Sequence, residues 1–393
     1  MSYNPVKYAD FVIALLNYCE ARAPGVVEAV EVENEHPTGA TYPERDPSRY
    51  YIDILKETYR RVKAHNPNIL VIMDGIWGGA YHHLDDIYQL GGKGYFDRTN
   101  VHYYTEDYVP GQTVQPTDIN TIWHYATTMR YLWRMAEDYE DYSAVMWLTE
   151  FGWRQQPENI KADWIIYTLD QSRKLGFVEK AEIYVGLSGG YPGGYDRMGL
   201  IYTDNDSNPS FLQLTTSYYR WQAYASSYPA WGLSHRELVP TVTPAAQDVA
   251  MDNPGFESGT ADGWSSYGTI DATVKYSGRY SMRQVSTNSI TTQLYTVEPG
   301  RLYEVTAWAK VDAPNPDTYY LWLAVGEFRT GTMDSQWPAP PNYYGVYDTR
   351  YYPKTWRRLR FLHRIPDNVD RIVVAFSGSG STNGTFWIDD VSI

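Results

Sequence analysis

A regular alternation of helical and apolar extended segments over residues 1–230 restricts the fold of this chain more than any other feature. Apolar residues at helical spacing predict helices over residues 4–23, 46–66, 118–139, 157–175 and 209–224. The apolar, mostly β-branched runs between them predict five strands, near Val30, Val71, Val101, Val145 and Tyr184. Because strands joined by helices pair in parallel and are covered on both faces, the pattern predicts an α/β fold.

The helical pattern ends near residue 238. Residues 239–248 contain Pro240 and Pro244 and have no periodicity, so we predict a linker there between a first domain, 1–238, and a second, 249–393. Short alternating runs follow, at 272–276, 289–295, 302–310, 319–325, 357–363, 371–377 and 385–393. Such runs without a helical stripe predict an all-β sandwich of the jelly-roll type.

Charge and composition exclude several classes of partner. The formal net charge is −14, and no Lys/Arg cluster is longer than a pair, so we expect neither a nucleic-acid nor a membrane partner. No apolar segment approaches the length of a membrane span. Cys19 is the single cysteine, so no disulfide can form within one chain. Met1 leads directly into a helix without a basic and an apolar leader region, so if the protein is secreted, as we expect, its export signal lies outside this sequence.

Two glutamates each follow an apolar extended segment. Glu35 comes after the strand near Val30 and before Pro37, which cannot donate to the next ladder bond. Glu150 comes directly after the apolar run 144–149. Either glutamate alone is more often a solvated loop residue, but a pair of carboxyl groups at strand ends is what the cleavage of a glycosidic bond requires.

Aromatic residues are unusually common, with 38 Tyr and 14 Trp in the chain. Flat amphipathic rings are the surfaces on which sugars stack, although Tyr-rich all-β proteins are also common. Trp77 and Trp153 follow strand ends, and each is compatible with flooring a sugar subsite or with packing against the tops of helices. His102 is likewise compatible with a functional role or with a place in the core.

The pair Asn34-Glu35 and the run Thr149-Glu150-Phe151-Gly152-Trp153 resemble the motifs of a large clan of retaining glycoside hydrolases built on (β/α)8 barrels, particularly families 39 and 5. In that clan an Asn-Glu pair ends the fourth strand and a Glu ends the seventh. The resemblance covers roughly residues 1–230.

The resemblance implies a role for each matching residue. Glu35 would be the general acid/base, Glu150 the nucleophile, and Asn34 the residue that binds the sugar 2-hydroxyl. His102 and Tyr104 resemble the sixth-strand pair of the clan, in which the tyrosine hydrogen-bonds the nucleophile. No cofactor is expected for catalysis.

The same resemblance implies a partial TIM-type barrel of five strands, truncated on its N-terminal side. The first three strands of the clan's barrel, with their arginine and histidine, have no counterpart here, and the segment 183–190 lacks the tryptophan usual in the eighth. Because an open sheet exposes two edges, we expect either a homo-oligomer that covers them or a truncated gene product.

The second domain is similar to carbohydrate-binding modules of families 4 and 9, through the segments 253–257, 263–264, 276–281 and 387–391. The similarity implies a structural calcium with Glu257 and either Asp389 or Asp390 as oxygen ligands. The alternative is that these carboxylates cap turns. Trp337, Tyr343, Tyr344 and Tyr347 are further candidates for stacking on sugars.

Together these features predict a retaining β-glycosidase that hydrolyses a β-linked polysaccharide or oligosaccharide by a two-glutamate double displacement. The alternative is a non-catalytic carbohydrate-binding protein built on a degenerate barrel. A structural or assembly protein is the third possibility.

Overall fold

The computed structural model divides into two compact units, with the main division between Thr241 and Val242. The predicted linker, 239–248, and the aromatic loop that holds Trp337 to Tyr347 lie outside the described residues, so the predicted domain bounds stay predictions. Each unit is described by itself. The described residues are 4–35, 47–77, 81–104, 116–117, 124–143, 145–153, 157–189, 198–203, 212–228, 249–264, 268–285, 289–312, 319–329, 355–380 and 384–393.

The first unit is built on parallel strands that pair in chain order. β1 and β2 form one pair, β3 to β6 form a four-stranded sheet, and a bridge between Ile72 and Arg98 lies between the two. A third sheet joins β7, β8 and β9. The bounds are β1 Ala29–Glu31, β2 Leu70–Ile72, β3 Ile76–Trp77, β4 Thr99–Tyr103, β5 Met146–Phe151, β6 Val178–Ile183, β7 Leu187–Gly189, β8 Ile201–Thr203 and β9 Leu212–Leu214.

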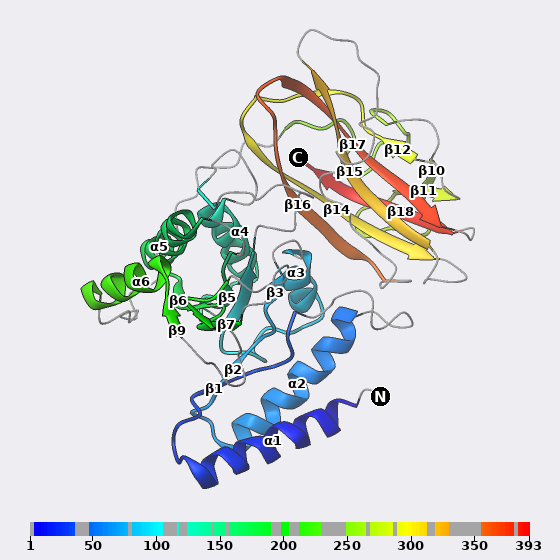
Figure 1. Ribbon diagram of the computed structural model, residues 1–393. Helices are drawn as coiled ribbons and strands as arrows, with labels where there is room; N and C mark the ends of the chain where they lie inside the picture. The colour runs from blue at the N-terminus through cyan, green and yellow to red at the C-terminus, as the bar shows by residue number, and fades with distance from the viewer. Residues whose placement is uncertain are drawn as a thin grey trace. The chain divides into compact units, whose positions relative to one another are not determined.

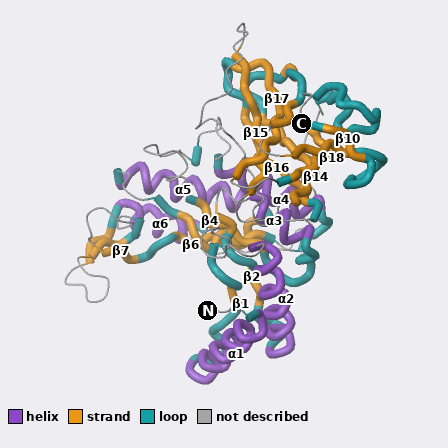
Figure 2. Tube along the Cα trace, turned by 90° about the vertical axis from the view of Figure 1, so that its right-hand side faces the viewer, coloured by secondary structure: helices purple, strands orange, loops and turns teal. Residues whose placement is uncertain are grey.

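Six helices are described in the first unit: α1 Pro5–Arg22, α2 Pro47–His65, α3 Tyr81–Gln89, α4 Tyr125–Asp138, α5 Glu158–Leu175 and α6 Thr216–Ser227. α1 and α2 lie side by side (Figures 1 and 2), and Arg61 of α2 donates to Asp10 of α1. Asn4 caps α1 by accepting from the backbone N–H groups of Val6 and Lys7. No described helix is both long and apolar enough to cross a bilayer.

Two predicted helices differ from those in the structure. The helix predicted at 209–224 begins at Thr216, because Thr215 is extended and its hydroxyl accepts from the N–H of Tyr218, and β9 occupies the residues before it. α4 is described from Tyr125, and residues 118–123 of its predicted span lie outside the described residues. The apolar residues of α1 are not all buried: Val12 and Leu16 are buried, whereas Phe11 is 64% exposed.

The second unit consists of two antiparallel sheets, which Figure 2 shows as orange strands. One sheet has the order β10-β11-β18-β14-β16, and the other has β12, β13 and β15 all paired with β17. Alternate residues of these strands, such as Val305, Ala307 and Ala309, form the core. The bounds are β10 Thr269–Asp271, β11 Ser281–Val285, β12 Ser289–Thr291, β13 Tyr295–Thr296, β14 Leu302–Asp312, β15 Tyr319–Arg329, β16 Arg357–Arg364, β17 Val369–Gly380 and β18 Thr385–Ser392.

The chain is thus a mixed α/β unit followed by an all-β unit, as predicted. The strand predicted at 272–276 is wrong, because Asp271 accepts from the backbone N–H groups of Thr273 and Val274 and turns the chain there. β11 was not predicted. The closure of the first sheet into a partial barrel and its covering by a second copy stay predictions.

Candidate active site

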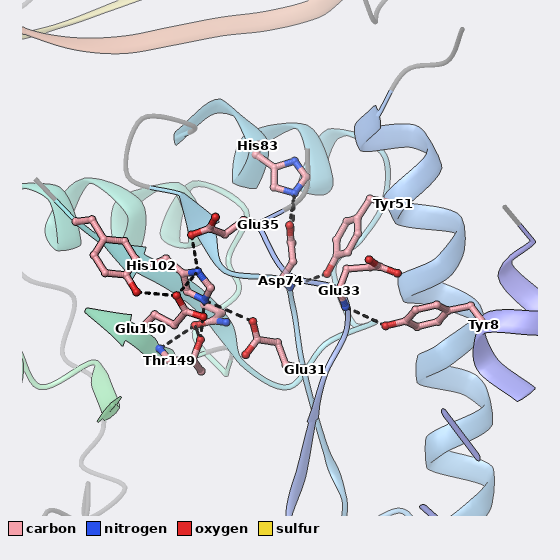
Figure 3. A network of polar contacts seen from close by, with 12 residues as sticks. Tyr8, Glu31, Glu33, Glu35, Tyr51, Asp74, His83, His102, Thr149 and Glu150 are labelled. Carbon is pink, nitrogen blue, oxygen red and sulfur yellow. Dashed lines mark hydrogen bonds and ion pairs between the residues drawn. The ribbon is translucent and has the colours of Figure 1, made fainter. Parts of the chain in front are cut away.

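His102 lies at the centre of the candidate site (Figure 3), near the C-terminal end of β4 and with no exposed side-chain surface. Its Nδ1 is 2.9 Å from Glu35 Oε1 and 3.5 Å from Glu150 Oε2. Its Nε2 is 3.1 Å from Thr149 Oγ1 and 3.6 Å from Glu31 Oε1. One imidazole therefore contacts three carboxylates that come from β1, the turn after it, and β5.

An irregular turn brings Glu35 to His102. The parallel ladder of β1 continues to Val32, whose N–H donates to Ile72 O at 3.0 Å. Glu33 and Glu35 then have positive φ angles of 69° and 49°, a backbone region that residues other than glycine seldom adopt. Backbone strain of this kind is concentrated at functional sites and persists only where the surroundings hold it.

A β-bulge in β5 places Thr149 and Glu150 together. Val101 pairs with Leu148 and His102 pairs with Glu150, so Thr149 is the extra residue of the ladder. Both side chains contact residues of β4 or of the segment directly after it: the Thr149 hydroxyl contacts His102, and Glu150 Oε2 accepts from the Tyr104 hydroxyl at 2.7 Å. A bulge of this kind re-aims a side chain next to a site.

The hydrogen bonds fix the tautomer of His102. The amide oxygen Oδ1 of Asn100 only accepts, and it takes the Thr149 hydroxyl proton at 2.9 Å and the Thr149 N–H at 3.2 Å. Thr149 Oγ1 must then accept from His102 Nε2, which therefore carries a hydrogen. Nδ1 is left facing Glu35 Oε1, and a single proton occupies that contact.

The surrounding charges decide how firmly this proton is held. Burial alone would lower the pKa of His102, but the contacts with Glu31 and Glu35 and the charge of Glu150 outweigh it and raise the pKa to about 9. Burial also raises the pKa of Tyr104, and its hydrogen bond to Glu150 raises it further. Tyr104 is therefore a permanent hydrogen-bond donor to Glu150 near neutral pH.

A close packing contact positions the His102 ring. A Cβ added at Gly75 would lie 2.2 Å from His102 Cδ2 and Nε2, so only glycine leaves room for the imidazole. The neighbouring Asp74 is fully buried, contacts His83 Nε2 at 3.1 Å and donates its backbone N–H to Tyr51 at 2.7 Å. These bonds hold the segment that carries Gly75.

Donor atoms of Glu35, His102 and Glu150 all lie within 4.8 Å of one another, close enough to share a metal ion. Two of these groups have hydrogen-bond partners in this arrangement: His102 Nδ1 lies 2.9 Å from Glu35 Oε1, and Glu150 accepts from Tyr104.

Among the other predicted sugar-binding residues of the first unit, Asn34 and Trp153 do not join this cluster. Asn34 is exposed in the turn beside Glu35. Trp77 ends β3, and its side chain lies outside the described ones. Trp153 has no exposed surface and packs among Tyr103, Phe151 and Trp164, so the prediction that it floors a sugar subsite is wrong and the packing alternative holds.

Sequence reasoning missed Glu31, Asn100, Thr149 and Gly75 at this site. Glu31 had a signal, because alternate residues of a strand share a face and Glu31 precedes Glu35 by four positions. Thr149 and Gly75 had none, since a bulge and a close contact both depend on a neighbouring strand.

In the second unit, both predicted calcium ligands bond to backbone N–H groups. Glu257 accepts from Arg279 and Tyr280, which keeps its pKa below the ordinary value. Asp389 is buried, which raises its pKa to about 6, and it accepts from Tyr276 and Ser277.

Carboxylate oxygens of Asp389 and Asp390 also lie close to Gly255. A Cβ added there would lie 2.9 Å from Asp390 Oδ1 and 3.8 Å from Asp389 Oδ1. The hydrogen bonds to backbone N–H groups fit turn capping, and calcium binding stays a prediction.

An aromatic cluster lies on the surface of the second unit. Tyr276 is 42% exposed and stacks on Trp308 of β14, with 3.7 Å between the ring centroids and an interplanar angle of 12°. Trp356 lies 6.0 Å from Tyr276.

Comparison with known proteins gives one family match. Residues 250–382 match the family described as a carbohydrate binding domain (CBM_4_9). No curated protein matches the chain.

Several solved structures are similar at low identity. A family 39 glycoside hydrolase from the gut symbiont Bacteroides cellulosilyticus WH2 is 17% identical with a TM-score of 0.42, over 95% of this chain and 62% of that one. The CBM22-1 and GH10 modules of a Clostridium thermocellum endo-1,4-β-D-xylanase, complexed with xylohexaose, are 16% identical with a TM-score of 0.30, over 37% of this chain and 28% of that one. A CBM22-1 xylan-binding domain from Paenibacillus barcinonensis is 15% identical with a TM-score of 0.30, over 38% of this chain and 96% of that one.

Proposed function

We propose that this protein is a retaining β-glycosidase that hydrolyses a β-linked polysaccharide or oligosaccharide, with Glu35 as acid/base and Glu150 as nucleophile. The observation that supports it is the placement of Glu35 and Glu150 oxygen atoms within 4.8 Å of one another. Retaining enzymes hold their two carboxyl groups about 5–5.5 Å apart, whereas inverting enzymes need about 6.5–9.5 Å to admit a water.

In the first step, a Glu150 oxygen attacks the anomeric carbon while Glu35 gives its proton to the glycosidic oxygen. The bond between the anomeric carbon and that oxygen breaks, the alcohol leaves, and a glycosyl ester of Glu150 forms. In the second step, water attacks the anomeric carbon and gives a proton to Glu35, and the ester bond breaks. Both carboxyl groups then return to their starting states, and the anomeric configuration is retained.

Tyr104 and His102 support this assignment electrostatically. The Tyr104 hydroxyl donates to Glu150 at 2.7 Å, which favours the ionised nucleophile. His102 lies between the two carboxylates. Its Nδ1 is within ion-pair distance of both, 2.9 Å from Glu35 and 3.5 Å from Glu150.

The test is hydrolysis of aryl β-glycosides and β-linked polysaccharides by the wild type and by Glu35→Gln and Glu150→Gln. We expect each substitution to lower kcat by at least about a thousandfold, since the nucleophile and the acid act as one unit. Azide should restore turnover of an activated aryl glycoside by Glu150→Ala, and NMR should show the β-anomer as first product from the wild type. Glu33→Gln, the same change on the same segment, serves as the control.

A non-catalytic carbohydrate-binding protein is the second candidate, favoured by the family match, which covers the second unit alone. We propose that the aromatic cluster of Tyr276, Trp308 and Trp356 is the sugar contact of that unit, because exposed stacked rings offer a flat apolar face. In native gels that contain the polysaccharide, migration of the wild-type protein should be slowed by binding. This slowing should be lost in Tyr276→Ala and kept in Tyr228→Ala, a change at a comparably exposed tyrosine of the first unit. Retention without hydrolysis by the wild type would favour this candidate.

We also propose a structural calcium held by Glu257 with Asp389 or Asp390, supported by the approach of one carboxylate oxygen of each aspartate to Gly255. Its role would be to neutralise buried and adjacent negative charge where β18 meets the first turn of the unit.

A further inference from the structure

We propose that Glu31 is a positioning residue of this site: its carboxylate, acting through the imidazole of His102, holds one proton between His102 Nδ1 and Glu35 Oε1. The inference rests on the proposed function only for its kinetic consequence, because the proton can be measured without a substrate.

Glu31 lies beside His102 at the end of β1. It is the last residue of β1, its side chain is 26% exposed, and its Oε1 atom is buried without a hydrogen-bond partner in the described structure. This atom lies 3.6 Å from His102 Nε2, beyond hydrogen-bond distance but within ion-pair distance. Figure 3 shows Glu31 on the Thr149 side of His102 and Glu35 on the opposite side of the ring.

His102 Nε2 carries a hydrogen. Thr149 Oγ1 must accept from it, because the Thr149 proton is given to Asn100. The negative Glu31 oxygen lies beside the same Nε2–H. Loss of this hydrogen would place a nitrogen lone pair against a carboxylate and leave Thr149 Oγ1 without its donor, so Nε2 keeps its hydrogen over the working pH range.

The charge of the ring then depends on Nδ1. With Nε2 protonated, a second proton at Nδ1 makes the ring cationic, and the charge on Glu31 stabilises that cation through the ring. The other carboxylates that face the ring are Glu35, at 2.9 Å, and Glu150, at 3.5 Å. Glu35 is the partner that shares the proton, while Glu150 is occupied by the Tyr104 hydroxyl.

The consequence is a proton reservoir for the acid. The proton that leaves for the glycosidic oxygen is the one shared by His102 and Glu35, and it stays on the pair until the pH passes the raised pKa of His102, about 9. Removal of the Glu31 charge should let the pair lose this proton at lower pH. The alkaline limit of activity then depends on a residue that touches neither the sugar nor Glu35.

The experiment is an NMR titration of the ring nitrogens in ¹⁵N-histidine-labelled full chain, with His102 assigned by its loss in His102→Asn. We expect a midpoint near 9 in the wild type and one about one pH unit lower in Glu31→Gln, which keeps the shape and removes the charge. The matched control is Glu33→Gln. Glu33 is two residues away and lies on the Tyr8 side of the segment in Figure 3, so the midpoint should stay unchanged.

A wild-type midpoint near the ordinary histidine value of about 6.5, or equal midpoints in the wild type and Glu31→Gln, would overturn the inference. An equal shift in Glu33→Gln would also overturn it, because the effect would then be one of net charge. If the enzyme is active, the alkaline limb of kcat/KM should move with the NMR midpoint. If no glycoside is hydrolysed but the NMR shifts occur as stated, the proposed function fails and the role of Glu31 stands.

Discussion

At the scale of single residues, the candidate site is a set of side chains that fix one another's protons. Asn100 orients Thr149, Thr149 orients His102, and His102 faces Glu35. Sequence reasoning identified the two glutamates, His102 and Tyr104, because their types and strand-end positions are visible in the chain. It could not tell Glu31 from Glu33, since strict alternation puts both on the face of Glu35, and only the positive φ of Glu33 separates them.

Gly75 offers a test of how tightly His102 is placed. The Cβ of Gly75→Ala would lie 2.2 Å from the ring, so the imidazole must move and its contacts with Glu35 and Thr149 must lengthen. We expect kcat/KM to fall by about ten- to a hundredfold, and the free energy of unfolding by about 1–3 kcal/mol. Steady-state kinetics and urea denaturation measure the two effects.

Gly186→Ala is the matched control for this prediction, because a Cβ there has no neighbour within 4 Å. Equal activities for Gly75→Ala and the wild type would show that the ring position tolerates movement.

Tyr104 gives a second prediction at this scale. Tyr104→Phe removes the donor to Glu150 but keeps the ring, which packs edge-on against Tyr184 at 6.2 Å. We expect kcat to fall by about ten- to a thousandfold with little change in stability, because one charge-assisted hydrogen bond to the nucleophile is lost. Tyr139→Phe, which also removes a hydroxyl bonded to a carboxylate, Asp85, should retain full kcat. A Tyr104→Phe enzyme with wild-type kcat would contradict the role given to the tyrosine.

At the scale of elements, the sequence predicted the strands and helices whose signals are local. α1, with Asn4 and Pro5 at its start, and α5, which ends at Gly176 with a φ of 79°, lie where predicted. The predictions were wrong where a side-chain hydrogen bond to the backbone sets the local structure. Thr215 caps α6, so the helix begins later than predicted, and Asp271 forms a turn where a strand was predicted. The bulge at Thr149 was invisible because it exists only as a register between strands.

Asp271 carries a prediction at this scale. One oxygen accepts from Thr273 and Val274, and the other accepts from the indole of Trp387 at 2.9 Å. Burial acts to raise the pKa of Asp271, but these hydrogen bonds outweigh it and lower it. We expect Asp271→Ala to lower the stability of the second unit by about 1–3 kcal/mol, measured by denaturation between pH 5 and 8, and the exposed Asp367→Ala to have little effect.

The pH dependence of this stability has a definite sign. A carboxyl whose pKa is lowered by folding stabilises the protein above its unfolded value of about 3.8 and loses that contribution as the pH falls toward the folded value. The difference between wild type and Asp271→Ala should therefore be constant from pH 5 to 8 and shrink below about pH 3.8. A difference that grew in acid would show that the hydrogen bonds are not made to the ionised form.

At the scale of the whole molecule, the alternation of helical and extended segments was enough to predict an α/β unit followed by an all-β unit. The bounds of the two domains were predicted from the loss of periodicity at 239–248, a segment that lies outside the described residues. The closure of the first sheet depends on long-range contacts, for which no local residue pattern exists. The many aromatic residues have different roles in the structure: Trp153 is buried in the core, whereas Tyr276 is exposed.

Removal of calcium should lower the thermal stability of the protein. The full chain should unfold at a lower temperature in EDTA than with millimolar Ca²⁺, by about 4–8 °C for each kcal/mol of binding free energy in a small unit. The melting temperature of the Asp389→Asn, Asp390→Asn double variant should not respond to Ca²⁺. An equal melting temperature for the wild type in EDTA and in Ca²⁺ would leave turn capping as the role of these carboxylates.

The position of β18 has a consequence for synthesis. Although it is the last strand of the second unit in sequence, it lies in the middle of the five-stranded sheet, between β11 and β14. During translation, β11 and β14 leave the ribosome long before their common partner, and each keeps an unpaired edge until then. The second unit therefore cannot complete its core until β18 has emerged, which makes the nascent chain dependent on protection from aggregation over the roughly hundred residues that separate β11 from β18.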